Sequence, residues 1–161
     1  MMTDFNTSFD RLLGNEGGYV FNPADPGGET NWGISKRSYP TVDIKNLTRD
    51  QARDIYYQDF WLPLAGDTLP GSVAFQLFDF AVNSGIQTAL RAYQRALGVA
   101  DDGNFGSASL AAAQAMPADK QIMRVLGERL DFMRKLRAWP TFGSGWAGRI
   151  ANDLRFGAGD I

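Results

Sequence analysis

Apolar side chains recur every three or four residues along most of this chain, which is the spacing of amphipathic helices. Thr48 and Gln51 form a capping-box pattern at the start of one such segment, and Gly98 stands where another would end. The segment SVAFQLFDFAVNSG is apolar on nearly all sides, which is typical of a buried central helix. The pattern predicts helices over residues 7–15, 48–60, 72–85, 87–97, 107–116 and 120–138, and one or two helical turns around 146–154.

Residues 19–36 interrupt the helical pattern. A short apolar run begins at Tyr19, turn-forming residues occupy 23–28, and a second short apolar run begins at Trp32. One small β-hairpin region near the N-terminus, with helices elsewhere, predicts an α+β fold class that is mostly helical. The chain has 161 residues and no internal repeat or long linker, so we expect a single domain.

The composition narrows the chemistry, because the chain contains no cysteine and no histidine. The first absence excludes disulfides and thiolate metal sites, and the second excludes Ser-His-Asp and Cys-His catalysis and His-ligated zinc. The run Asp101–Asn104 lacks the alternating ligand spacing of a calcium loop and is interpreted as a turn. We therefore expect no metal and no cofactor. If the protein is a hydrolase, carboxylates must carry the acid–base chemistry.

The chain has only three glutamates, and their surroundings differ. Glu128 lies on the charged face of an expected helix beside Arg124, where a surface ion pair is the simplest interpretation. Glu29 follows two glycines at a turn, where we expect it to be solvated. Glu16 differs from both, because it stands where the first helix is expected to end.

Two features of that position favour a protonated Glu16. A helix C-terminus carries partial negative charge, and the apolar neighbours Leu12 and Leu13 reduce solvation of a carboxylate. A carboxyl that keeps its proton near neutral pH can protonate a leaving group. The spacing alone leaves open the alternative that Glu16 is only a polar residue at a helix end.

Asp25 follows Glu16 by nine residues and precedes Pro26. A turn explains an aspartate here without any chemistry. Together with Glu16, it could also be the second carboxylate of a glycosidase, which positions or deprotonates a water molecule. Thr30 could help to hold that water through its hydroxyl. Nine turn-rich residues permit the carboxyl separation of either an inverting or a retaining enzyme.

Further along the chain, several side chains are suited to sugar binding. Asn31, Tyr57 and Asn83 offer amide or aromatic groups that can hydrogen-bond to or stack on a sugar ring, and we predict that they bind substrate. The alternative for any aromatic residue in a chain of this size is a place in the core. We expect that place for Trp61 and Trp146.

The longest motif, EGGYVFNPADPGGETNWGIS from Glu16 onward, resembles the opening of the glycoside hydrolase 108 family. This family comprises ZliS-type N-acetylmuramidases of phage endolysins and prophages. The motifs DIYYQDFW and FDFAVNSG follow in the family's order, and VADDGNFGSASLAA resembles its C-terminal peptidoglycan-binding segment. The order Glu16, Asp25, Thr30 is also similar to the Glu/Asp/Thr triad of phage-type lysozymes, although the threonine spacing is one residue shorter here.

This resemblance implies a lysozyme-like domain with two lobes. Residues 5–66 would form the catalytic lobe, which includes the β region, and residues 67–161 a helical lobe that is peptidoglycan-binding-like. Glu16 would protonate the β-1,4 bond between N-acetylmuramic acid and N-acetylglucosamine, and Asp25 with Thr30 would position the attacking water. Two alternatives stay open: a lytic transglycosylase that acts with Glu16 alone, and a non-catalytic peptidoglycan-binding module of a phage particle.

The net charge of −2 is unevenly distributed. Segment 120–155 carries eight basic and three acidic side chains, so it could contact an anionic outer membrane, although a solvated helix face is the simpler interpretation. We expect peptidoglycan as the partner, no nucleic acid, and a monomer. The N-terminus has no signal-peptide pattern, so we expect synthesis in a bacterial host cytoplasm and action on the wall after release, by holin-type export if the gene is a phage's.

Overall fold

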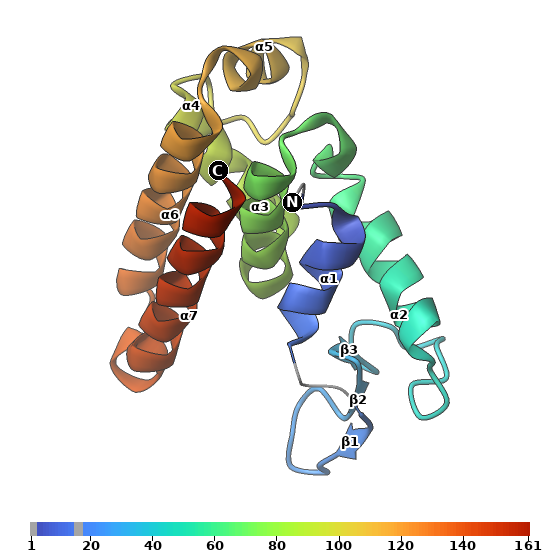
Figure 1. Cartoon of the computed structure of the whole chain (residues 1–161). Coiled ribbons are helices and arrows are strands. Elements are labelled where there is room, and N and C mark those ends of the chain that lie inside the picture. The colour runs from blue at the N-terminus through green and yellow to red at the C-terminus, as the bar shows by residue number, and fades with distance from the viewer. Residues whose placement is uncertain (1–2, 15–17) are drawn as a thin grey trace.

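The structure, a computed structural model, describes residues 3–14 and 18–161. Helices form most of it, and Figure 1 shows the small sheet at one end of the helical bundle. Two short segments of other helix types, η1 (Tyr57–Trp61, a π-helix) and η2 (Gly66–Thr68, a 3-10 helix), follow the second α-helix. The α-helices are α1 (Phe5–Leu13), α2 (Arg49–Tyr56), α3 (Gly71–Ser84), α4 (Ile86–Leu97), α5 (Ser107–Ala115), α6 (Ala118–Arg134) and α7 (Trp139–Asp160).

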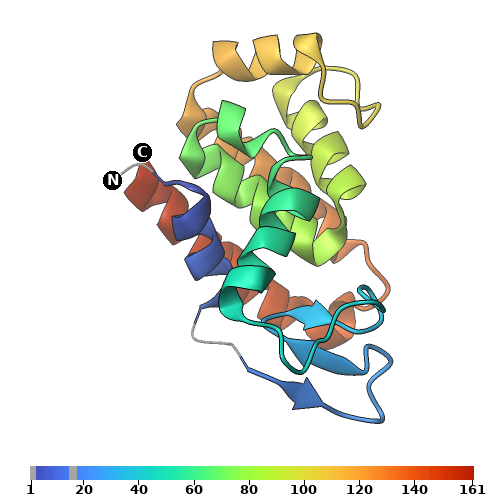
Figure 2. The same cartoon turned by 90° about the vertical axis from the view of Figure 1, so that its right-hand side faces the viewer.

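The sheet has three short antiparallel strands in the order β1 (Val20–Phe21), β2 (Glu29–Asn31) and β3 (Ile34–Ser35). In both views it lies beyond the ends of α1 and α2, away from α5 (Figures 1 and 2). Thr30 is at its centre, because it pairs with Val20 on one side and Ser35 on the other. The α+β class, mostly helical and lysozyme-like with a small β region near the N-terminus, is therefore confirmed.

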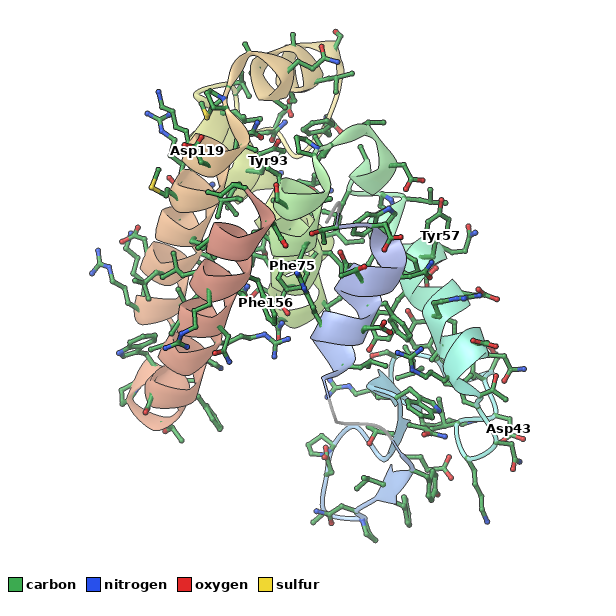
Figure 3. All side chains as sticks on the ribbon, in the orientation of Figure 1. Asp43, Tyr57, Phe75, Tyr93, Asp119 and Phe156 are labelled. Atoms are coloured by element: carbon green, nitrogen blue, oxygen red, sulfur yellow. The ribbon has the colours of Figure 1, made fainter. Side chains whose placement is uncertain are left out.

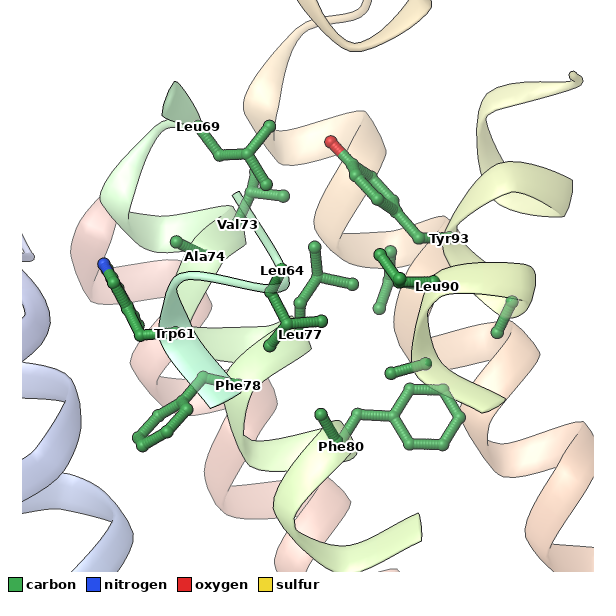
Figure 4. Close-up of a cluster of buried hydrophobic side chains, with 14 of the residues drawn as sticks. Trp61, Leu64, Leu69, Val73, Ala74, Leu77, Phe78, Phe80, Leu90 and Tyr93 are labelled. Carbon is green, nitrogen blue, oxygen red and sulfur yellow. The ribbon is translucent and has the colours of Figure 1, made fainter. Parts of the chain in front are cut away.

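Helix α3 forms the centre of the core, as its apolar sequence predicts. Every residue from Ser72 to Ala81 is buried. Figure 4 shows α3 residues packed against Trp61 on one side and against Leu90 and Tyr93 of α4 on the other. Trp61 is 2 % exposed, which agrees with the core position expected for it. Burial of this many large apolar side chains is the main stabilising contribution to the fold.

The first and last helices lie side by side, and a polar contact joins them (Figures 1 and 2). Arg11 of α1 donates to both carboxylate oxygens of Asp160 in α7, at 2.6 and 2.8 Å. Its guanidinium also lies 4.5 Å from the ring centroid of Phe156 and 5.3 Å from that of Phe75. A bidentate ion pair flanked by aromatic rings holds α1 against the C-terminal helix.

The largest difference from the sequence prediction is α7. One or two turns were expected around 146–154, but α7 runs for 22 residues and is the longest helix described. Pro140 lies at its first turn, where a missing N–H costs no helical hydrogen bond. Gly157 packs so closely on α6 that an added Cβ would lie 3.0 Å from Cγ2 of Ile122. Tertiary packing therefore stabilises a helix that its five glycines disfavour.

Some local expectations are confirmed and others are wrong. The capping box of α2 is present, because the Thr48 and Gln51 side chains each bond to the other residue's backbone N–H. Helix α6 ends at Arg134, four residues earlier than expected. Glu128 makes its ion pair with Arg95 of α4, at 2.9 Å, instead of the expected pair with Arg124. Nothing in the structure tests the division of the chain into lobes 5–66 and 67–161, which stays a prediction.

Candidate active site

A hollow of about 560 Å³, the main hollow, opens between the sheet and the helices. The end of α1 contributes Leu12 and Leu13 to its wall, and the residues just before and within β1 also line it. The rest of the wall comes from Thr30, Trp32, Gly33, Tyr56, Val82 and Arg149. Elements that are far apart in the sequence thus meet around one space, with apolar, aromatic, hydroxyl and cationic groups on its surface.

The tight turn between β2 and β3 forms one side of this hollow. Trp32 and Gly33 both have positive φ, 52° and 76°, as a type I′ hairpin turn requires. The Trp32 indole donates to the Leu47 carbonyl at 3.0 Å, and the Tyr56 hydroxyl donates to the Trp32 carbonyl at 3.2 Å. An added Cβ on Gly33 would lie 2.4 Å from the Tyr56 hydroxyl oxygen, so only glycine fits. The turn is therefore fixed against α2 despite the strained backbone of Trp32.

Tyr56 keeps its proton in this setting. Burial raises the pKa of Tyr56 to about 12, and the nearby positive charge of Arg149 opposes that rise without cancelling it. The hydroxyl is therefore a neutral hydrogen-bond donor throughout the physiological range, and it serves to hold the turn.

Arg149 of α7 brings a positive charge to the same hollow. Its Nε and Nη2 donate to the two carboxylate oxygens of Asp79 in α3, at 2.9 and 2.6 Å. This two-point contact fixes the orientation of the guanidinium. Arg149 also lines a larger hollow of about 820 Å³ between α1 and α7, so the two spaces share its side chain as a wall.

Behind Arg149 lies a buried ionic cluster. Arg129 Nη1 donates to Asp79 at 2.7 Å and to Asp153 at 2.9 Å, and all three side chains are at most 4 % exposed. Burial acts to raise the pKa of Asp79, but hydrogen bonds from Arg149 and the charges of both arginines outweigh it and hold that pKa below its ordinary value. Burial and the adjacent Asp79 carboxylate raise the pKa of Asp153 to about 7.

Of the predicted catalytic residues, Thr30 lines the main hollow from the central strand. Glu16, the predicted acid, lies outside the described residues. Asp25 is exposed in the loop between β1 and β2 and does not line this hollow. Its Oδ1 accepts from the Gly27 N–H at 2.8 Å and its carbonyl accepts from the Gly28 N–H at 3.0 Å, so it makes the turn that the alternative interpretation required.

Glu29, in strand β2, also has a hydrogen-bond partner within the sheet region. Glu29 accepts a hydrogen bond from the Tyr19 hydroxyl at 2.7 Å, across the β1–β2 pair. This bond ties Tyr19, which lines the hollow, to Glu29 of β2.

The predicted substrate-binding residues lie in three different places. Asn31 is buried, and its Nδ2 donates to the carbonyls of Ile44 and Leu47, at 3.0 and 3.2 Å. Tyr57 lies on η1, away from the sheet, and its hydroxyl donates to Asp67 at 2.6 Å (Figure 3). Asn83 is exposed in the last turn of α3, and its Nδ2 donates to the Asp79 carbonyl at 2.7 Å. The structure brings Asn83 close to Arg149, but not Asn31 or Tyr57.

Two further properties of the described residues concern metal binding and membrane-spanning helices. Among residues 3–14 and 18–161, no cluster of three or more acidic side chains could hold a metal ion. Within the same part of the chain, no helix combines the length and the apolar character needed to cross a bilayer.

The comparisons with known proteins match this architecture. The model of the family glycosyl hydrolase 108 matches residues 9–85, which include the sheet and the wall residues of α1, α2 and α3. The structure of Brucella abortus SagA is similar over 97 % of this chain and 95 % of that one, with 36 % sequence identity and a TM-score of 0.85. The chain belongs to the glycosyl hydrolase 108 family. No curated protein matches it.

Family membership makes the chain a glycoside hydrolase, and at the level of the family it supports peptidoglycan as the substrate class. Sequence reasoning missed Arg149, which lies beyond the segment that the family model matches. A signal for it existed: Asp79 is the only charged residue in the largely apolar sequence of α3, and a buried carboxylate requires a cationic partner.

Proposed function

We propose that the protein is an N-acetylmuramidase that hydrolyses the β-1,4 bond between N-acetylmuramic acid and N-acetylglucosamine in peptidoglycan, with Glu16 as the general acid. The observation that carries the proposal is the hollow of about 560 Å³ between the sheet and the helices. Family membership supports a glycosidic bond as the target. Beyond family membership, the proposal specifies which glycosidic bond is cleaved and that Glu16 is the acid.

The surroundings of the main hollow suit a carboxylic acid that must keep its proton. Leu12 and Leu13 of α1 line it, and so does Gly18, which follows Glu16 by two residues. Apolar walls disfavour the charged form of a carboxyl. In the proposed reaction, Glu16 gives its proton to the glycosidic oxygen as the bond breaks.

The attacking water needs a second group. Thr30 lines the hollow and offers a hydroxyl that can orient a water molecule, whereas Asp25 is exposed in its turn. We propose that Thr30 holds the water and that Asp25 contributes to its activation once a glycan strand covers the loop. If no residue fulfils this role, the enzyme is a lytic transglycosylase, in which the sugar's own hydroxyl replaces water as the nucleophile.

The test is the Glu16→Gln variant, which keeps the size of the side chain and removes its proton. We expect purified sacculi to be solubilised at least about 100-fold more slowly, since general acid catalysis contributes about 10²–10⁴-fold. Mass spectrometry of the wild-type products should show reducing muramic acid ends. Anhydro-muramyl ends, which are lighter by one water, would establish the transglycosylase instead.

A matched control is Glu128→Gln, which removes the ion pair between Glu128 of α6 and Arg95 of α4. This variant should solubilise sacculi at the wild-type rate. Full activity of a folded Glu16→Gln variant would exclude Glu16 as the acid.

Oligomeric state, release to the wall and membrane contact form the last part of the proposal. We propose a monomer that reaches the wall after release from the cytoplasm. We also propose that segment 120–155 could contact an anionic outer membrane. Fewer of its positive charges are available for this contact than the composition implies, because Arg129 is buried and Arg134 and Lys135 both pair with Asp131.

A further inference from the structure

A second and smaller hollow, of about 100 Å³, lies where α3, α6 and α7 meet. Asn83 and Ser84 from the last turn of α3 line one side, and Arg149 lines another. Because Arg149 also lines the main hollow, the two spaces adjoin at its side chain. A ligand that occupies both hollows must therefore pass beside Arg149.

The apolar part of this second hollow comes from three side chains. Met133 is 5 % exposed, and Leu136 and Trp146 are half-buried beside it. The ring of Trp146 stacks against Phe142, with the ring centroids 5.9 Å apart. Side chains packed in this way form a fixed apolar surface that suits a methyl group.

The polar part of this hollow includes a donor from Arg129 and an acceptor from Asn83. Arg129 lines the hollow, and its Nε–H is buried with no acceptor in the described part of the chain. A buried N–H of this kind is costly unless a ligand or a water molecule accepts its hydrogen bond. The Nδ2 of Asn83 is engaged with the Asp79 carbonyl, which leaves the amide oxygen of Asn83 as the acceptor of that side chain.

We propose that this second hollow binds the acetamido group of a sugar residue in the glycan strand. This inference rests on the proposed function, because peptidoglycan sugars carry that group. Its carbonyl oxygen would accept from Arg129, its N–H would donate to Asn83, and its methyl would contact Met133 and Leu136. A volume of about 100 Å³ corresponds to about three water molecules, so it admits an acetyl group and excludes much larger acyl groups.

The test measures how the size of the acyl group affects binding. The probes are N-acetylglucosamine tetramer and the same tetramer carrying N-butyryl groups, both uncharged, titrated calorimetrically into the inactive Glu16→Gln protein. We expect the N-acetyl tetramer to bind at least about ten-fold more tightly, as pocket discrimination of added methylene groups allows. Leu136→Ala in the same background enlarges the hollow and should bring the N-butyryl tetramer to within about three-fold of the N-acetyl one.

The matched control is Leu154→Ala, which truncates an exposed leucine of α7 that does not line this hollow. It should keep the ten-fold preference. Equal binding of the two tetramers, or no binding of the N-acetyl tetramer at millimolar concentration, would overturn the acetamido proposal. So would a preference that Leu136→Ala leaves unchanged. Since wild-type solubilisation of sacculi tests the proposed function separately, failure of one can be told from failure of the other.

Discussion

Two regions of the molecule hold aspartates in opposite ways. In the loop between β1 and β2, Asp25 is exposed, and all its hydrogen bonds to described residues join it to backbone groups within three residues of itself. In the helical part, Asp79 and Asp153 are buried and share the guanidinium of Arg129. The first arrangement is local in sequence. The second joins residues that are 24 and 50 positions from Arg129.

The difference shows how the site is supported. The loop holds its carboxylate through one short contact with the Gly27 N–H. The buried cluster instead holds Arg149 in the wall of two hollows, because Asp79 bonds both Arg129 and Arg149. A buried set of charges thus orients Arg149, which lines both hollows, whereas the carboxylate of Asp25 is held only by a contact within its own turn in the described part of the chain.

The largest expected effect comes from removing the shared cation. Arg129→Met leaves two aspartates buried with too little positive charge, and we expect the free energy of unfolding to fall by about 3–5 kcal/mol. Urea unfolding followed by circular dichroism measures this. Arg134→Met is the control, because it removes an exposed pair with Asp131 and should cost less than about 1 kcal/mol. Equal losses in the two variants would show that the buried cluster contributes nothing special to stability.

A smaller effect concerns pH and Asp153. An acid whose pKa is higher in the folded than in the unfolded protein stabilises the fold most at low pH, and it loses this contribution as the pH rises through its folded pKa. For Asp153 that window runs from about 4 to about 7. Asp153→Asn cannot ionise, so between pH 5 and pH 7 the variant should gain on wild type by up to about 1.4 kcal/mol per pH unit.

Urea unfolding of both proteins at several pH values gives this difference directly. Because the two carboxylates interact, removing Asp153 also changes the ionisation of Asp79, so the difference reports the pair. Asp131→Asn, at an exposed aspartate, provides the control and should run parallel to wild type. A constant difference between Asp153→Asn and wild type from pH 5 to pH 7 would mean that Asp153 ionises normally.

The same contrast explains how far sequence reasoning reached. The presence of α1 to α6, the capping box of α2 and the β region follow from residues that are neighbours in the chain, and local patterns predicted them, although not every helix boundary. The turn role of Asp25 was also predicted from Pro26 and the two glycines after it. These features need no knowledge of tertiary contacts.

What local patterns could not supply is the partner of a buried group. Asp79 signals a partner, but the chain has 16 lysines and arginines, and Arg149 is 70 residues away. Helix α7 was missed for a related reason. Its glycines disfavour a helix in isolation, and only the contact of Gly157 with Ile122 in α6 shows why one of them is tolerated.

The smallest expected effect on stability is at Asp25, where it separates turn from chemistry. Asp25→Asn keeps the side-chain oxygen that accepts from the Gly27 N–H, so thermal unfolding should match wild type within about 0.5 kcal/mol. Asp25→Ala removes that acceptor and should cost about 1 kcal/mol. If Asp25 also activates water, both variants lose most of their muramidase rate, although only one is destabilised. If Asp25→Asn keeps the full rate, Asp25 serves the turn alone, and either Thr30 holds the water or the enzyme is the transglycosylase.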